Sequence, residues 1–193
     1  MSGPGCESQS ETEYMIDRKK IEQTARRQGW ADFKWIAGRD VQVREWTRFK
    51  CMFGCDTYGK KGGCPPNVPS IPECRELFKE YKHILVIHLS AKFDHPDQRK
   101  AWSRKHNAKL LKLERAVFLA GHYKAFLLFM DECRVCAECP GTRLECRNPR
   151  LSRPCPEALG VDVFATVRAI GFPIEVLTDY KQTMNRYAFL LVE

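Results

Sequence analysis

The sequence contains no long hydrophobic run, which excludes an ordinary membrane-spanning helix. Crossing a bilayer takes about 20 consecutive apolar residues, whereas the longest apolar runs here, 84–89 and 125–130, have the length of a strand. Residues 1–12 have neither the basic start nor the apolar segment of a secretory signal. A glycine-rich nucleotide-binding loop is also missing. We therefore expect a cytoplasmic protein that does not interact with a membrane.

The remaining composition is that of a folded protein. Of the 193 residues, 44% are hydrophobic and 11% are aromatic, which is enough to build a sizeable core. The polar segment 1–12 is predicted to be a disordered leader. We expect residues 13–193 to form a single domain.

Hydrophobic periodicity predicts a fold of the α/β (or α+β) class, with a mixed sheet and helices packed on it. Helical spacing of apolar residues predicts helices near 17–28, 70–81, 97–120 and 162–170. Short apolar or alternating segments predict strands at 33–36, 41–46, 83–90, 124–130, 174–177 and 186–192. The strand–helix–strand order over 83–130 suggests a parallel crossover.

Cysteine is the unusual component of the chain. There are ten cysteines, and a reducing cytoplasm disfavours disulfides. Nine of the ten lie in two short windows, 51–74 and 133–155, whereas cysteines that only fill a core would be scattered. This clustering indicates metal ligation by two cysteine-rich loops. The tenth, Cys6, lies in the leader and is expected to be an idle thiol.

The second window has the spacing of an iron–sulfur site. Cys133, Cys136 and Cys139 follow one another at three-residue steps, Pro140 comes next, and Cys146 provides a fourth thiol. A chain with this spacing can curl around a four-iron four-sulfur (4Fe-4S) cluster so that each thiolate reaches a different iron. Zinc is an alternative, although structural zinc more often uses two separated pairs of cysteines. Redox-active thiols are a further alternative.

The first window supplies a less regular set of thiols. Cys51, Cys55, Cys64 and Cys74 could hold a second cluster. Glycines between them allow the backbone to fold tightly and to aim amides at sulfur. Cys74 comes at the start of a predicted helix, so a core role is its alternative. One site shared by both windows is also compatible with the spacing.

Cys155, near the end of the second window, is expected to be a helix-start residue. Four nearer thiols already complete a cluster there, which leaves Cys155 as an extra ligand only in the alternative interpretation. Two other cysteine chemistries do not match the sequence. A radical S-adenosylmethionine enzyme would carry its third cysteine where this chain has Tyr58, and covalent haem attachment would need histidine in place of Ala137.

The chain is basic, with a net charge of +8 from 32 basic and 24 acidic residues. The excess lies between 99 and 124 and around the second window. Such a field could attract an acidic protein, a small anion or nucleic acid. We disfavour nucleic acid, because Trp102 is expected on the apolar side of the basic helix rather than among its charges. A solvated helix face that also supports anionic thiolate–metal centres is the simpler interpretation.

The two windows resemble the signatures of a known family. The segments 49–55, 58–59 and 64–69, together with 133–139, 146–149, 153–154 and 157–163, are similar to motifs of an uncharacterised family of predicted metal-binding proteins, which are small prokaryotic proteins with a domain of unknown function. This chain departs from the family pattern at Cys155, where members of the family usually have serine. The likeness covers nearly the whole chain after the leader. It implies metal binding by the matching cysteines and implies no particular reaction.

These observations predict a metal-binding protein that carries one or two 4Fe-4S clusters. We expect it to act in electron transfer, or as an accessory redox factor for a partner enzyme, and therefore to bind a redox partner protein. A zinc-stabilised binding module and an enzyme with an open cluster iron are the alternatives. The sequence leaves the oligomeric state and any substrate open.

Overall fold

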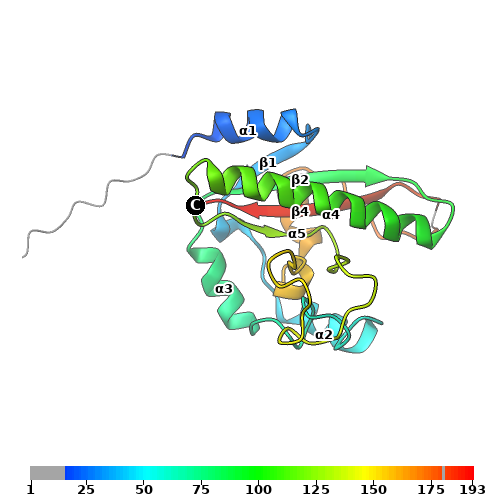
Figure 1. Ribbon diagram of the computed structural model, residues 1–193. Coiled ribbons are helices and arrows are strands. Elements are labelled where there is room, and N and C mark those ends of the chain that lie inside the picture. The colour runs from blue at the N-terminus through cyan, green and yellow to red at the C-terminus, as the bar shows by residue number, and fades with distance from the viewer. Residues whose placement is uncertain (1–15, 180) are drawn as a thin grey trace, which may run out of the picture.

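A four-stranded sheet forms the centre of the protein in a computed structural model that describes residues 16–179 and 181–193 (Figure 1). Its strands, in spatial order, are β1 (Phe33–Ile36), β2 (Ile84–Ala91), β4 (Met184–Leu191) and β3 (Phe126–Leu128). Every neighbouring pair is antiparallel. The last strand of the chain therefore lies in the interior of the sheet, between β2 and β3.

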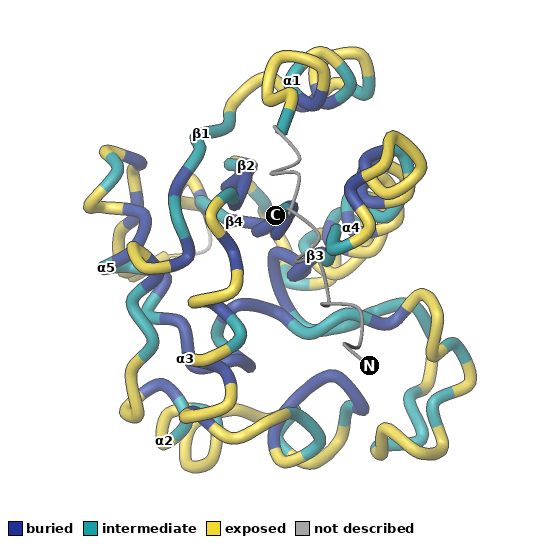
Figure 2. The backbone as a smooth tube through the Cα atoms, turned by 90° about the vertical axis from the view of Figure 1, so that its left-hand side faces the viewer, coloured by how far each residue is buried: buried dark blue, intermediate teal, exposed yellow. Residues whose placement is uncertain are grey.

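Helices cover both faces of this sheet, as Figures 1 and 2 show. Successive side chains of β2 point to opposite faces and are buried on both, which explains its uninterrupted apolar sequence. One face packs against α1 (Arg18–Arg27) and α4 (Pro96–Leu119). The other packs against α3 (Ile71–Lys79) and α5 (Val163–Ala169).

The start of α3 is fixed by a capping box. The Ser70 hydroxyl accepts the Glu73 N–H at 3.5 Å, and the Ser70 N–H donates to the Glu73 carboxylate at 2.7 Å. The Ser70 hydroxyl also donates to the Glu73 carboxylate at 2.6 Å, and this bond together with that from the Ser70 N–H holds the pKa of Glu73 below its usual value. The helix then buries Ile71, Cys74 and Phe78 on one side.

Several sequence predictions are confirmed and others are wrong. The class, helices packed on a sheet, is confirmed. Segment 41–46 is not a strand, because Val43 makes only an isolated bridge to Val161 and helix α2 (Glu45–Gly54) begins there. Segment 174–177 also forms no strand: no other strand pairs with it, and Val176 is 76% exposed.

The connection from β2 through α4 to β3 differs from the predicted parallel crossover. Both strands run antiparallel to β4, so they point the same way, but β4 separates them. The sheet therefore contains no parallel pair among the described strands and is not mixed. The predicted leader 1–12 and Cys6 lie outside the described residues, and the assignment of 13–193 to one domain stays a prediction. None of the helices in the described part of the chain has the length and apolar character needed to cross a bilayer.

Candidate metal centres

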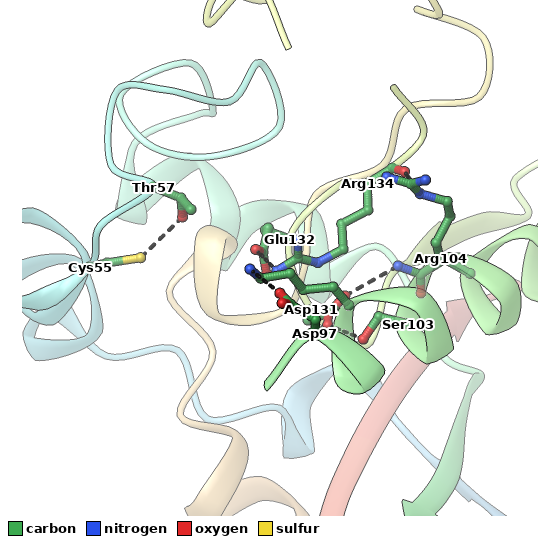
Figure 3. Close-up of polar contacts among 10 residues, drawn as sticks. Cys55, Thr57, Asp97, Ser103, Arg104, Asp131, Glu132 and Arg134 are labelled. Carbon is green, nitrogen blue, oxygen red and sulfur yellow. Dashed lines mark hydrogen bonds and ion pairs between the residues drawn. The ribbon is translucent and has the colours of Figure 1, made fainter. Parts of the chain in front are cut away.

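The second cysteine window is a loop whose two ends meet at the end of β3. The Phe129 N–H donates to the Pro154 carbonyl at 2.9 Å, so the chain that leaves the sheet returns beside it. Asp131, at the start of the loop, is buried. Its carboxylate accepts a hydrogen bond from Ser103 on α4 (Figure 3). It also accepts one, at 3.3 Å, from Asn107 on the same helix.

The returning end of the loop is fixed to the same helix. Arg153 donates two hydrogen bonds to the carboxylate of Glu114 on α4, at 2.9 and 2.8 Å. Glu114 also accepts the Leu127 N–H at 2.8 Å. Because this carboxylate is buried and fully paired, it fixes the loop, α4 and β3 to one another.

Four cysteines of this loop surround a small closed cavity. Cys133, Cys136, Cys139 and Cys146 are each partly buried and line a space of about 10 Å³, and we call them the enclosed group. The structure thus brings together the four thiols that the spacing predicts to share a site.

The backbone of the first window completes the wall of the enclosed group. The Gly62 N–H donates to Cys139 Sγ at 3.4 Å, and Asn148 Nδ2 donates to Cys136 Sγ at 3.1 Å. A Cβ atom on Gly62 would lie 2.6 Å from the Thr142 carbonyl oxygen, so only glycine allows this approach. Hydrogen bonds of this kind stabilise negative charge on sulfur.

A second set of four cysteines lines a larger cavity of about 200 Å³. We call Cys51, Cys55, Cys64 and Cys155 the open group. Cys51 lies on α2 and Cys55 follows it, Cys64 comes from the loop, and Cys155 comes from the returning end of the second window. Cys64 and Cys155 are 6% and 8% exposed, whereas Cys55 is exposed and lies 3.1 Å from the Thr57 hydroxyl (Figure 3).

Burial and neighbouring groups raise the pKa values of three thiols in the open group. Burial raises the pKa of Cys51, and the neighbouring Cys55 raises it further. Burial, with Glu132 and Cys55, raises the pKa of Cys64 to about 12. Burial also raises the pKa of Cys155 well above its usual value. Cys51, Cys64 and Cys155 are therefore neutral thiols at neutral pH when no metal is bound, and metal binding would release their protons.

Cys74 lines neither cavity. It is 0% exposed, belongs to the hydrophobic core with Phe78, and lies 3.7 Å from the Pro69 carbonyl oxygen. Burial raises its pKa to about 11. The structure therefore places it in the core role that we gave as its alternative. The spacing of Ile71, Cys74 and Phe78 is that of a buried helix face, and this signal was available in the sequence.

Cys155 joins the open group, which sequence reasoning missed. It does precede a short helix, η2 (Glu157–Leu159), as expected. One signal could have indicated its second role: Cys155-Pro156 repeats the dipeptides Cys64-Pro65 and Cys139-Pro140. Among the described residues, no three Cys, His, Asp or Glu side chains are already arranged to hold a single metal ion.

Comparison with known protein families matches residues 34–192 to one described as "Predicted metal-binding protein (DUF2284)". No curated protein and no solved structure matches the chain. The matched segment contains all eight cysteines of the two groups. Because the match covers most of the 193 residues, the chain belongs to this family of predicted metal-binding proteins.

Proposed function

We propose that each four-cysteine group holds a 4Fe-4S cluster and that the protein transfers single electrons to or from a partner protein in the cytoplasm. The observation that carries the proposal is that Cys155, which belongs to the second window, lines the same cavity as three cysteines of the first window. In two-cluster ferredoxins, a cysteine that precedes proline likewise leaves its own run of cysteines and ligates the other cluster. Cys155-Pro156 follows the run at 133–139 and lies with Cys51, Cys55 and Cys64.

The side chains at each group fit an iron–sulfur cluster. Each cavity offers four thiols and no histidine, and soft thiolate sulfur is the ligand that such clusters use. Cys136 and Cys139 accept hydrogen bonds from N–H donors, which would favour the reduced, more negative state. A bound cluster would supply one-electron chemistry.

Zinc in the enclosed group is a second candidate, favoured by one observation. The cavity of about 10 Å³ is roughly the space of one water-sized particle, and a zinc ion is held by four sulfur atoms at about 2.3 Å. In this version the enclosed group is structural and only the open group carries a cluster.

A partner protein would need to approach the open group. Helix α2 carries Cys51 and exposes Trp46, Phe49, Met52 and Phe53. The ring centroids of Phe49 and Phe53 lie 6.3 Å apart in a stacked arrangement, so these two exposed rings are neighbours on the surface. An acidic redox protein with an apolar contact patch suits this helix and the net charge of +8.

Anaerobic purification followed by iron, sulfide and zinc analysis tests the proposal. Two clusters predict about eight iron and eight sulfide per chain, and zinc in the enclosed group predicts about four of each with one zinc. Thiols that stay empty in both groups after reconstitution would refute it.

A pair of variants tests the assignment of the fourth ligand. Cys155→Ser should remove about half of the iron, because the open group loses a ligand. Cys74→Ser, a change of the same chemistry at a buried core position, should keep it. Full iron in the Cys155 variant would contradict the assignment of Cys155 as the fourth ligand of the open group.

A further inference from the structure

Three cavities adjoin one another around Arg186 on β4, which lines all of them. One is the cavity of the open group, a second, of about 230 Å³, also contacts Cys51 and Cys55, and a third measures about 520 Å³. Arg99 on α4 lines the cavity of the open group and the third cavity. The two arginines therefore stand where the cavities meet, beside the open group.

These two arginines make no hydrogen bond or ion pair among the described residues. Their Nε atoms are buried without a hydrogen bond, whereas each arginine as a whole is only partly buried. Arg48 and Arg134 also have a buried Nε without a hydrogen bond, but the Nη2 atom of each donates, that of Arg48 to the Pro69 and Ala158 carbonyls and that of Arg134 to Glu132. Arg99 and Arg186 therefore differ in offering donors that find no partner in the described part of the chain.

The nearby carboxyl groups do not provide this partner. Asp131 accepts hydrogen bonds from Ser103 and Asn107, and Glu132 is held by Arg134. Glu157 lines the cavity of the open group and is influenced by the charge of Arg186, without an ion pair between them among the described residues. Burial and the charge of Arg186 lower the pKa of Arg99, and the charges of Asp131 and Glu132 offset only part of this effect. An anion between the two arginines would counter the repulsion that remains.

The second cavity supplies a surface for the rest of a ligand. Its wall includes the apolar side chains of Trp46, Val161, Phe164 and Ile174. A ligand pocket typically combines an apolar wall with a few polar groups that orient the molecule. Here the charged groups are Lys50 and Arg186 together with Glu157 and Asp162, and Cys51 and Cys55 of the open group belong to the same lining.

We propose that these adjoining cavities bind a small organic anion, whose carboxylate or phosphate lies between Arg99 and Arg186 and whose apolar part contacts the wall that includes Trp46. Guanidinium groups bind both kinds of anion through paired N–H donors. The ligand would lie beside Cys51 and Cys55, and its binding does not rest on the proposed function.

Calorimetric titration of the anaerobically purified protein tests the site with benzoate and phenyl phosphate as probes and benzyl alcohol as the uncharged comparison. We expect at least one anion to bind and benzyl alcohol to bind at least about 10-fold more weakly. Arg99→Gln and Arg186→Gln should each weaken the anion about 10-fold or more. Arg186→Lys should give a smaller loss, because it keeps the charge but not the fork of donors.

Arg115→Gln is the matched control, since Arg115 is an exposed arginine on the same helix as Arg99, and it should bind like the unaltered protein. Circular dichroism confirms that each variant is folded. The proposal is overturned if neither anion binds, if benzyl alcohol binds equally well, or if both glutamine variants bind normally. Iron analysis of the same samples separates the two proposals: arginine-dependent binding without iron refutes the clusters alone, and full iron with arginine-independent binding refutes the anion site alone.

Discussion

The two cysteine groups differ in how closely the chain surrounds them. The enclosed group has a regular spacing, a cavity of about 10 Å³ and two N–H donors on its sulfur atoms. The open group collects its thiols from three parts of the chain around about 200 Å³, and two further cavities adjoin it. A shielded centre suits storage or relay of an electron, and an accessible one suits contact with a partner or ligand. If the proposed function holds, this difference would give the two groups separate tasks.

Removing a thiol from the enclosed group should have the largest effect. We expect Cys136→Ser to lose the metal of that group together with stability on the order of several kcal/mol, because metal binding there is coupled to folding. Metal analysis and urea unfolding measure both quantities. Cys6→Ser, in the segment predicted to be a leader, should change neither. Full metal content in the Cys136 variant would contradict its assignment as a ligand.

Breaking the attachment of the second cysteine window to α4 should have the second-largest effect. Glu114→Ala leaves Arg153 without its buried partner, and such a loss costs about 3 kcal/mol or more. Both groups should then lose metal, because Arg153 stands between the enclosed loop and Cys155. Urea unfolding and iron analysis report the effect. Glu76→Ala removes an exposed ion pair to Lys79 and should cost less than about 0.5 kcal/mol; equal effects of the two changes would argue against the buried attachment.

A smaller change should affect the enclosed group more than the open one. Gly62→Ala places a Cβ 2.6 Å from the Thr142 carbonyl oxygen, which forces the two windows apart at a cost of about 1–3 kcal/mol. Gly54→Ala meets nothing within 4 Å and should change stability by less than about 1 kcal/mol. Metal content and thermal unfolding compare the two variants. If Gly62→Ala leaves the enclosed group fully loaded, the contact between windows does not shape it.

Removing the capping box of α3 should have the smallest effect and should leave the metal of both cysteine groups in place. Ser70→Ala removes the capping box of α3, which carries Cys74, and should cost about 1 kcal/mol without loss of metal. The lowered pKa of Glu73 means that its contribution is present above the unfolded-state pKa and disappears as the pH falls through the lower, folded-state pKa. The difference between variant and unaltered protein, measured by urea unfolding, should therefore shrink in acid. Loss of iron would show instead that α3 supports a metal site.

The local sequence pattern predicts the helices and strands that bury apolar side chains. It predicts less well which segments pair as strands and where α2 begins. The strand at 84–91 and the long helix α4 follow directly from their periodicity. The strand expected at 41–46 failed because Val41 and Val43 contact the core without a pairing strand. In addition, α2 begins at Glu45 after Arg44, which provides no side-chain cap that the sequence could reveal.

The enclosed group could be predicted because all its thiols lie within one loop. The open group could not, because Cys155 reaches it only through the pairing of Phe129 with Pro154 at the base of the second window. The approach of Arg99 to Arg186 could not be predicted from the sequence for the same reason. Arg99 looks like one of many surface cations in the sequence, and it meets Arg186 only because β4 inserts beside β2. Contacts between distant segments depend on topology, which spacing along the chain does not encode.

The placement of β4 also bears on when the proposed open group can form. Cys64 leaves the ribosome 91 residues before Cys155, so the open group remains one thiol short during that interval. The strand that separates β2 from β3 follows both cysteines along the chain. Until it is inserted, the base from which the second window departs has no neighbouring strand. A metal bound by all four thiols of the open group could therefore be held only after Cys155 and β4 have been synthesised.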